Sequence, residues 1–177
     1  MTTRREALIL SAVGIAATGA GFLVGPAILK LGGEGGQSKA LFEAKFSDLD
    51  GKIRQLDEWK ATVLLCNFWA TWCAPCREEI PLLIDMRAKY APSGFEVVGI
   101  AIDNVDKVRQ FASFMKIPYP VLVAGADGLE LMRRLGNSGG GLPYTVVTDR
   151  DGAVVRRKLG ALKAPELDDI LATYAKA

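Results

Sequence analysis

Apolar residues follow two patterns along this chain after residue 40. Continuous apolar runs at 63–69, 95–102 and 121–123 are typical of strands that are buried on both faces of a sheet. Apolar residues at helical spacing over 74–90 and 106–115, with charges between them, predict amphipathic helices. Strands and helices that alternate in this way indicate an α/β fold with a parallel core.

The remaining segments complete this sheet. Residues 144–148 and 154–159 predict a hairpin joined by an Asp-Gly turn, and residues 41–46 predict an edge strand. Helical turns are expected at 56–59 and 129–135, and Pro165 with the acidic Glu166 opens a last helix. We therefore expect a central mixed β-sheet flanked by helices.

The first 30 residues carry a different signal. Residues 7–29 have no charge and follow Arg4 and Arg5; at about 1.5 Å per residue they would cross roughly 30 Å of hydrocarbon. We expect a signal or membrane anchor over 1–30, a flexible glycine-rich linker over 31–40 and one domain over 41–177. Cleavage near Thr18-Gly19-Ala20 stays open, and Arg4-Arg5 resembles a twin-arginine export signal only in part. Basic residues before the apolar run place the domain on the far side of the membrane.

Composition narrows the chemistry. The 177 residues carry a net charge of +2, which predicts no basic face for nucleic acid. The chain has no histidine, so Cys-His and Ser-His catalytic pairs and histidine-ligated metals are excluded.

The candidate chemistry lies in Cys73-Ala74-Pro75-Cys76, between a predicted strand and a predicted helix. Unpaired N–H groups and the helix dipole at this helix start favour a thiolate, so Cys73 is the expected nucleophile. Cys76, one turn further in, would resolve a mixed disulfide on Cys73. A zinc site would need further ligands where only Cys66 remains, and a structural bond closing so small a loop would stabilise little. Cys66 itself reads as a small apolar core residue.

A longer segment resembles a known family. Residues 68–81, Phe-Trp-Ala-Thr-Trp-Cys-Ala-Pro-Cys-Arg-Glu-Glu-Ile-Pro, are similar to the active-site segment of membrane-anchored thioredoxin-like proteins of the TlpA and ResA type. The second motif of that family, Gly-x-Pro-x-Thr, is present at residues 141–145. The resemblance covers about residues 41–175. It implies a thioredoxin fold with an N-terminal strand extension and an extra βα unit near 95–116.

The resemblance also implies roles for further residues. Pro143 would be cis, and the backbone of Leu142 would then face the sulfurs and pair with an extended substrate segment. Trp72 and Pro75 would contact substrate beside Cys73. Glu79 would tune the thiols, although a helix carboxylate is more often solvated, as we expect for Glu78. At the position of the buried aspartate of ordinary thioredoxins this chain has Asn67, which cannot accept a proton.

The favoured function is therefore a thiol-disulfide oxidoreductase that reduces disulfides in exported proteins. The resemblance implies cytochrome c or copper-site assembly as its context, a membrane electron donor of the thiol-disulfide type, and a bacterial inner-membrane protein with one membrane span and a periplasmic domain. A cleaved signal would make the protein periplasmic. We expect a monomer without a cofactor or metal.

Two alternatives stay open: an oxidase or isomerase that installs disulfides, and a redox-inert module that binds extended peptides beside Pro143. A peroxidase is disfavoured because Thr71-Trp72-Cys73 lacks the Thr-x-x-Cys spacing.

Overall fold

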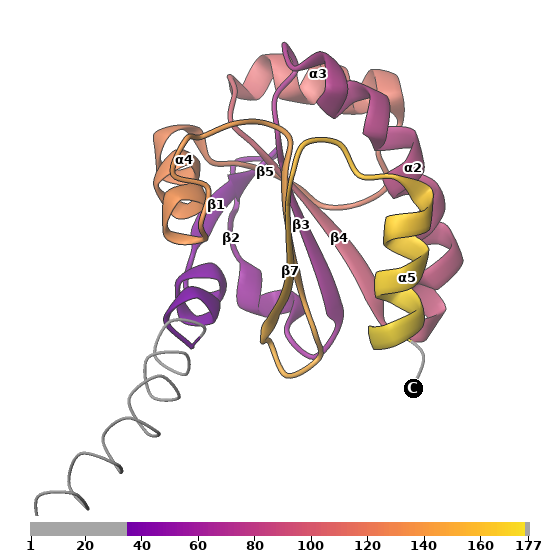
Figure 1. Ribbon diagram of the computed structural model, residues 1–177. Helices are drawn as coiled ribbons and strands as arrows, with labels where there is room; N and C mark the ends of the chain where they lie inside the picture. Colours follow the sequence, from indigo (N-terminus) through magenta and orange to yellow (C-terminus); the bar gives the residue numbers. More distant parts are fainter. Residues whose placement is uncertain (1–34, 176–177) are drawn as a thin grey trace, which may run out of the picture. The chain divides into compact units, whose positions relative to one another are not determined.

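A computed structural model of the chain describes residues 35–175, and the fold is that of the compact unit Gln37–Ala177 (Figure 1). The predicted anchor over residues 1–30 lies outside the described residues, as do residues 31–34 of the predicted linker. Residues 35–42 are helical, and Leu41 and Phe42 are buried in the core, so the packed part of the chain begins before residue 41. Across 35–175, none of the helices combines the length and the apolar character that a membrane span requires.

One mixed sheet organises the described residues. Its strand order is β2-β1-β5-β4-β3-β6-β7. Strands β3, β4 and β5 run parallel, whereas β6 is antiparallel to β3 and β1 is antiparallel to β5. The strands are β1 Lys45–Asp48, β2 Ile53–Gln55, β3 Val63–Trp69, β4 Phe95–Ala101, β5 Val121–Val123, β6 Tyr144–Thr148 and β7 Val154–Leu159.

Helices cover both faces of this sheet. In Figure 1, α2 and α5 lie on one side of the strands, and α4 lies on the other side near the helical segment 35–42. Two apolar clusters match these layers: one contains Leu83 of α2 and Leu167 of α5, and the other contains Leu41 and Met132 of α4. The helices are α2 Ala74–Tyr90, α3 Val105–Met115, α4 Gly125–Arg134 and α5 Ala164–Tyr174, with 3-10 helices at Leu56–Trp59 and Ala91–Ser93.

The predicted α/β class and thioredoxin fold are confirmed, but three local expectations differ from the structure. Residues 41–46 were expected to form a strand; instead, 35–42 are helical, Leu41 and Phe42 join the buried apolar cluster that contains Leu64, and β1 begins at Lys45. The strand β2 was not predicted. Helix α4 begins at Gly125 rather than near residue 129.

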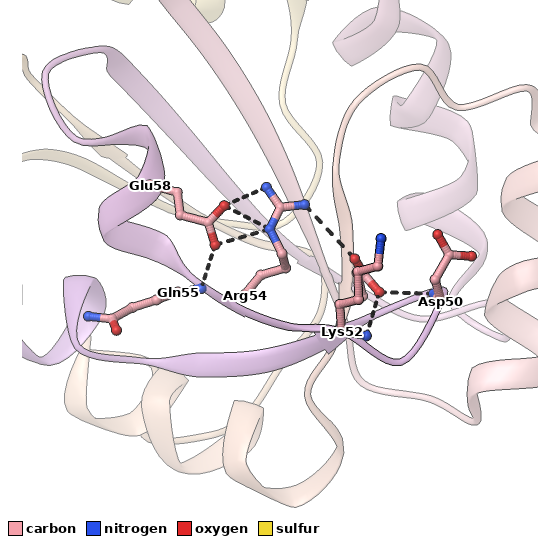
Figure 2. A network of polar contacts seen from close by, with 6 residues as sticks. Asp50, Lys52, Arg54, Gln55 and Glu58 are labelled. Carbon is pink, nitrogen blue, oxygen red and sulfur yellow. Dashed lines mark hydrogen bonds and ion pairs between the residues drawn. The ribbon is translucent and has the colours of Figure 1, made fainter.

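The predicted N-terminal strand extension is the β1–β2 hairpin, which pairs with β5 through β1 and leaves β2 at the edge of the sheet. Figure 2 shows the polar contacts that hold it. Asp48 Oδ1 accepts hydrogen bonds of 2.9 Å from the N–H groups of Asp50 and Lys52 in the turn. The Arg54 Nη2 atom lies 2.6 Å from Glu58 Oε2, which ties the hairpin to the following 3-10 helix. The predicted extra βα unit near residues 95–116 is β4 followed by α3, and β4 lies between β5 and β3 in the sheet.

Candidate active site

The cysteine pair lies where β3 passes into α2. All seven residues of β3 are buried, so the strand holds the following loop firmly. Cys73 is the N-cap of α2, and its Sγ accepts a hydrogen bond of 3.3 Å from the Cys76 N–H. The two cysteines form a disulfide, with their Cα atoms 5.3 Å apart. An N–H group of the first helical turn, that of Cys76, is therefore directed at the sulfur of Cys73, as expected from the sequence.

The two sulfurs differ in access. Cys76 is fully buried and Cys73 is 6% exposed, so attack from outside is directed at Cys73. Trp72 is 68% exposed at the rim, and Pro75 is exposed in the first turn of α2. Both residues lie within two positions of Cys73 and are open to solvent.

Glu79 does not lie on the surface. Its side chain is 3% exposed, whereas the neighbouring Glu78 is exposed. Its Oε2 accepts a hydrogen bond of 2.8 Å from the Leu162 N–H, and its Oε1 accepts one of 2.8 Å from Asn67 Nδ2. Burial raises the pKa of Glu79, and the two hydrogen bonds oppose this shift in part. The alternative that Glu79 is a solvated helix residue like Glu78 is therefore wrong, because its side chain is buried.

Asn67 links this carboxyl to the last residue of the second motif. Its Nδ2 also donates to Thr145 Oγ1 of β6 at 3.1 Å. Its Oδ1 atom is buried and has no hydrogen-bond partner among the described residues. The residue that the sequence marked only as a missing acid thus holds Glu79 in place.

The second motif lies at the same end of the sheet as the cysteines. The Leu142–Pro143 peptide bond is cis, and β6 begins at Tyr144, which pairs with Phe68 near the end of β3. Pro143 is buried, and its carbonyl accepts a hydrogen bond of 2.9 Å from the Gly160 N–H. Leu142 is half-buried and packs against both apolar clusters.

Sequence reasoning did not identify Asp103 as part of the site. Its Oδ2 accepts hydrogen bonds from the Thr71 N–H at 3.0 Å and from the Thr71 hydroxyl, two residues before Cys73. Burial alone would raise the pKa of Asp103, but the hydrogen bonds from Thr71 and Asn104 outweigh it and the pKa is lowered. A signal was available, because Asp103 follows a predicted parallel strand and such strands end at the edge where sites form.

Cys66 is separate from the pair. It lies in the apolar cluster on the α4 side of the sheet, whereas Cys73 and Cys76 lie in the cluster on the α2 side. Complete burial raises the pKa of the Cys66 thiol. Its predicted role as a core residue agrees with this placement.

The chemistry available is thiol-disulfide exchange. A reachable sulfur at a helix start and a buried second sulfur within bonding distance can pass a disulfide to and from a partner. Residues 35–175 contain no group of three or more His, Cys, Asp or Glu side chains that could hold a metal ion.

Comparisons with known proteins give the same chemistry. Residues 36–157 match the model of the AhpC/TSA family. The chain is 31% identical over 127 residues to the thiol-disulfide oxidoreductase ResA of Bacillus thuringiensis strain Al Hakam, covering 71% of this chain and 70% of that protein.

Solved structures show the same fold. A thiol:disulfide interchange protein of the thioredoxin family from Chlorobium tepidum TLS is 31% identical with a TM-score of 0.65, over 75% of this chain and 92% of the other. A thiol:disulfide interchange protein from Bacteroides sp. is 21% identical with a TM-score of 0.64, over 75% and 86%, and supports the fold alone.

Proposed function

Since the chain belongs to the AhpC/TSA family of the thioredoxin superfamily and is a thiol-disulfide oxidoreductase, we propose that it works as a reductase of disulfides in exported proteins. Its reduced form would hold two thiols, at Cys73 and Cys76, and would donate two electrons to each substrate disulfide.

The observation that carries the reducing direction is the buried carboxyl of Glu79. It lies one helical turn after Cys76, and the dipeptide between the cysteines, Ala74-Pro75, has no charge. Oxidising pairs owe their strength to a stabilised reduced form, in which a thiolate has a low pKa. When this carboxyl is ionised, its negative charge disfavours a thiolate at the pair, so it supports a more reducing pair.

The proposed reaction has two exchange steps. The Cys73 thiolate attacks one sulfur of the substrate disulfide; the substrate S–S bond breaks, a mixed disulfide forms, and the leaving thiolate takes up a proton. Cys76, after losing its proton, then attacks the Cys73 sulfur. This step forms the Cys73–Cys76 disulfide and releases the second substrate thiol. A thiol-disulfide donor in the membrane would return the pair to the dithiol by the same exchange in reverse.

Four residues around Cys73 are proposed to contact the substrate: Trp72, Pro75, Leu142 and Pro143. Trp72 and Pro75 are exposed beside the reactive sulfur. Leu142 lies two residues before the start of β6, so its backbone offers an extended segment of the substrate a place to pair as an added strand.

The location and substrate class also belong to this proposal. The charged and apolar pattern of residues 1–30 supports a membrane anchor with the domain in the periplasm. The resemblance to the ResA type supports cytochrome c or copper-site assembly as the context. Under this proposal the protein acts as a monomer.

The reduction potential tests the direction. Equilibration with a dithiothreitol redox buffer is expected to give a value below about −200 mV, in the range of thioredoxins and glutaredoxins. A value near about −120 mV, as in strong disulfide donors, would reverse the proposed direction.

Trapping tests the substrate class. Cys76→Ala should accumulate mixed disulfides on Cys73 in cells, because no second thiol is placed to resolve them, and Cys73→Ala should trap far fewer. Partners with Cys-x-x-Cys-His or copper-site cysteines would support the assembly role. A broad set of unrelated exported proteins would favour the oxidase or isomerase alternative, and equal trapping by both variants would refute the assignment of Cys73 as nucleophile.

A further inference from the structure

A groove of about 280 Å³ lies next to the reactive sulfur on the side of α3. Three residues of the first turns of α2 and three of α3 line it: Ala74, Arg77, Glu78, Phe111, Phe114 and Met115. Because Ala74 follows Cys73 directly, the groove begins beside the attacking residue.

Phe114 is exposed without a structural reason. The α3 helix packs through its buried residues Val108 and Ala112, and Phe111 contacts Trp69 with ring centroids 5.6 Å apart. Phe114 is 80% exposed and Trp72 is 68% exposed. A single exposed apolar side chain is ordinary, but here one lines a groove beside the nucleophile and the other adjoins the nucleophile in sequence.

The chemistry of the reaction brings a polypeptide to this place. A substrate that is covalently attached to the Cys73 sulfur must run across the surface around Ala74. The groove carries one cation, Arg77, and one anion, Glu78, at its otherwise apolar wall. The groove is shallow and open to solvent, so it suits one side chain of a bound protein better than a small molecule that needs to be enclosed.

We propose that the α2–α3 groove binds a large apolar side chain of the protein substrate, located within a few residues of the cysteine under attack. This inference rests on the proposed function, since it requires a protein disulfide as substrate. The groove would be a second substrate contact, besides the one proposed at Leu142. The two contacts lie on opposite sides of β3, because α3 follows β4, Leu142 precedes β6, and β4 and β6 flank β3. The substrate would be held on both sides of Cys73.

Two synthetic peptides with one internal disulfide test the groove. One has Phe two residues after its second cysteine, the other has Ala there, and hydroxyethyl disulfide serves as a disulfide too small to reach α3. The reduced full-length protein is expected to reduce the Phe peptide about tenfold faster than the Ala peptide, the effect of burying part of one aromatic ring. Phe114→Ala should bring this ratio near one, and Phe114→Leu should retain most of it.

The matched control is Ile53→Ala, which removes an exposed apolar side chain of similar character from β2, the far edge strand. It should leave the ratio unchanged. Equal rates for both peptides with the unchanged protein, or an equal loss on both peptides in Phe114→Ala, would overturn the inference alone. Failure to reduce any of the disulfides, hydroxyethyl disulfide included, would overturn the proposed function and the inference with it. Concentration-dependent dimers that Phe114→Ala abolishes would assign the groove to a second copy of the chain and would also overturn it.

Discussion

Glu79 is a buried carboxyl whose two oxygens are held by donors from different parts of the chain. The Leu162 N–H belongs to the loop before α5, and the Asn67 amide belongs to β3. These donors stabilise the ionised form, yet burial dominates and the pKa is raised above the ordinary 4.5. A carboxyl of this kind can carry a proton at a pH where a surface glutamate cannot, which suits proton transfer with a neighbouring thiol.

The variant Glu79→Gln, which cannot take up or release this proton, should change both the pH dependence of stability and the rate of thiol-disulfide exchange. Because the folded pKa of Glu79 is raised, its contribution to stability is complete below the unfolded pKa and is lost as the pH rises through the folded pKa. Between about pH 4 and about pH 8, the free energy of unfolding in urea should therefore fall in the unchanged protein because of Glu79, and this part of the fall should be missing in the variant. Thiol-disulfide exchange should slow by at least about tenfold, and the thiol titration should shift.

Asp85→Asn is the control for that experiment, since Asp85 is an exposed carboxylate on the same helix. The glutamine variant is expected to fold. Asn67 Oδ1 has no partner among the described residues, so a half-turn of the Asn67 amide would present this oxygen as an acceptor to the new side-chain NH₂ group at position 79. Unchanged thiol titration and exchange rates would remove Glu79 from the chemistry.

At the scale of elements, the long apolar runs were predictable and the short pieces were not. β3 and α2 match their predicted bounds because a buried run and a helical repeat each leave a strong pattern. β2 has only three residues and its Ile53 is exposed, so no alternation marks it. The start of α4 contains Gly125 and Gly128, which favour a turn by local preference and are overridden by packing.

The site was predictable where its residues are close in sequence. Cys73, Cys76 and Glu79 are related by helical spacing, and the helix places them accordingly. Asp103 follows another strand, β4, and its contact with Thr71 depends on how β3 and β4 pair. Such contacts between distant segments follow from the register of the sheet, which a single sequence does not specify.

The contact from the end of β4 to the active-site loop can be tested with Asp103→Ala. Loss of the hydrogen bonds to Thr71 should lower the free energy of unfolding by about 1 kcal/mol at neutral pH. Because the folded pKa of Asp103 is lowered, this difference should shrink as the pH falls through that pKa, where the carboxylate is protonated in the unchanged protein as well. Urea midpoints at neutral and acidic pH measure both effects.

The exposed Asp50, in the turn between β1 and β2, supplies the comparison as Asp50→Ala. It should change stability little at either pH. A destabilisation by Asp103→Ala that stays constant with pH would contradict the role of the charged carboxylate in holding Thr71.

At the scale of the whole molecule, we predict different behaviour for the isolated domain and for the full chain. The described core is complete within the unit Gln37–Ala177, so residues 37–177 produced alone should fold as a soluble monomer. The full chain should sediment with membranes because of the apolar stretch after Arg4 and Arg5. Light scattering of the domain and fractionation of cells that express the full chain measure the two outcomes.

Reporters fused after Ala177 test the orientation. Alkaline phosphatase should be active there and a cytoplasmic reporter should not, because the basic residues stay in the cytoplasm. Activity of the cytoplasmic reporter alone would refute the proposed topology.

The sheet separates the third cysteine sulfur of the described residues from the reactive pair, and this limits the molecule to one two-electron couple. Cys73 and Cys76 accept or give two electrons together, whereas Cys66, behind the sheet and fully buried, has a thiol with a raised pKa. The third sulfur therefore takes no part in the couple, although an odd number of cysteines would otherwise allow wrong pairings. We expect the pair to alternate between the Cys73–Cys76 disulfide and two thiols, and each turnover then transfers two electrons without a radical or a one-electron intermediate.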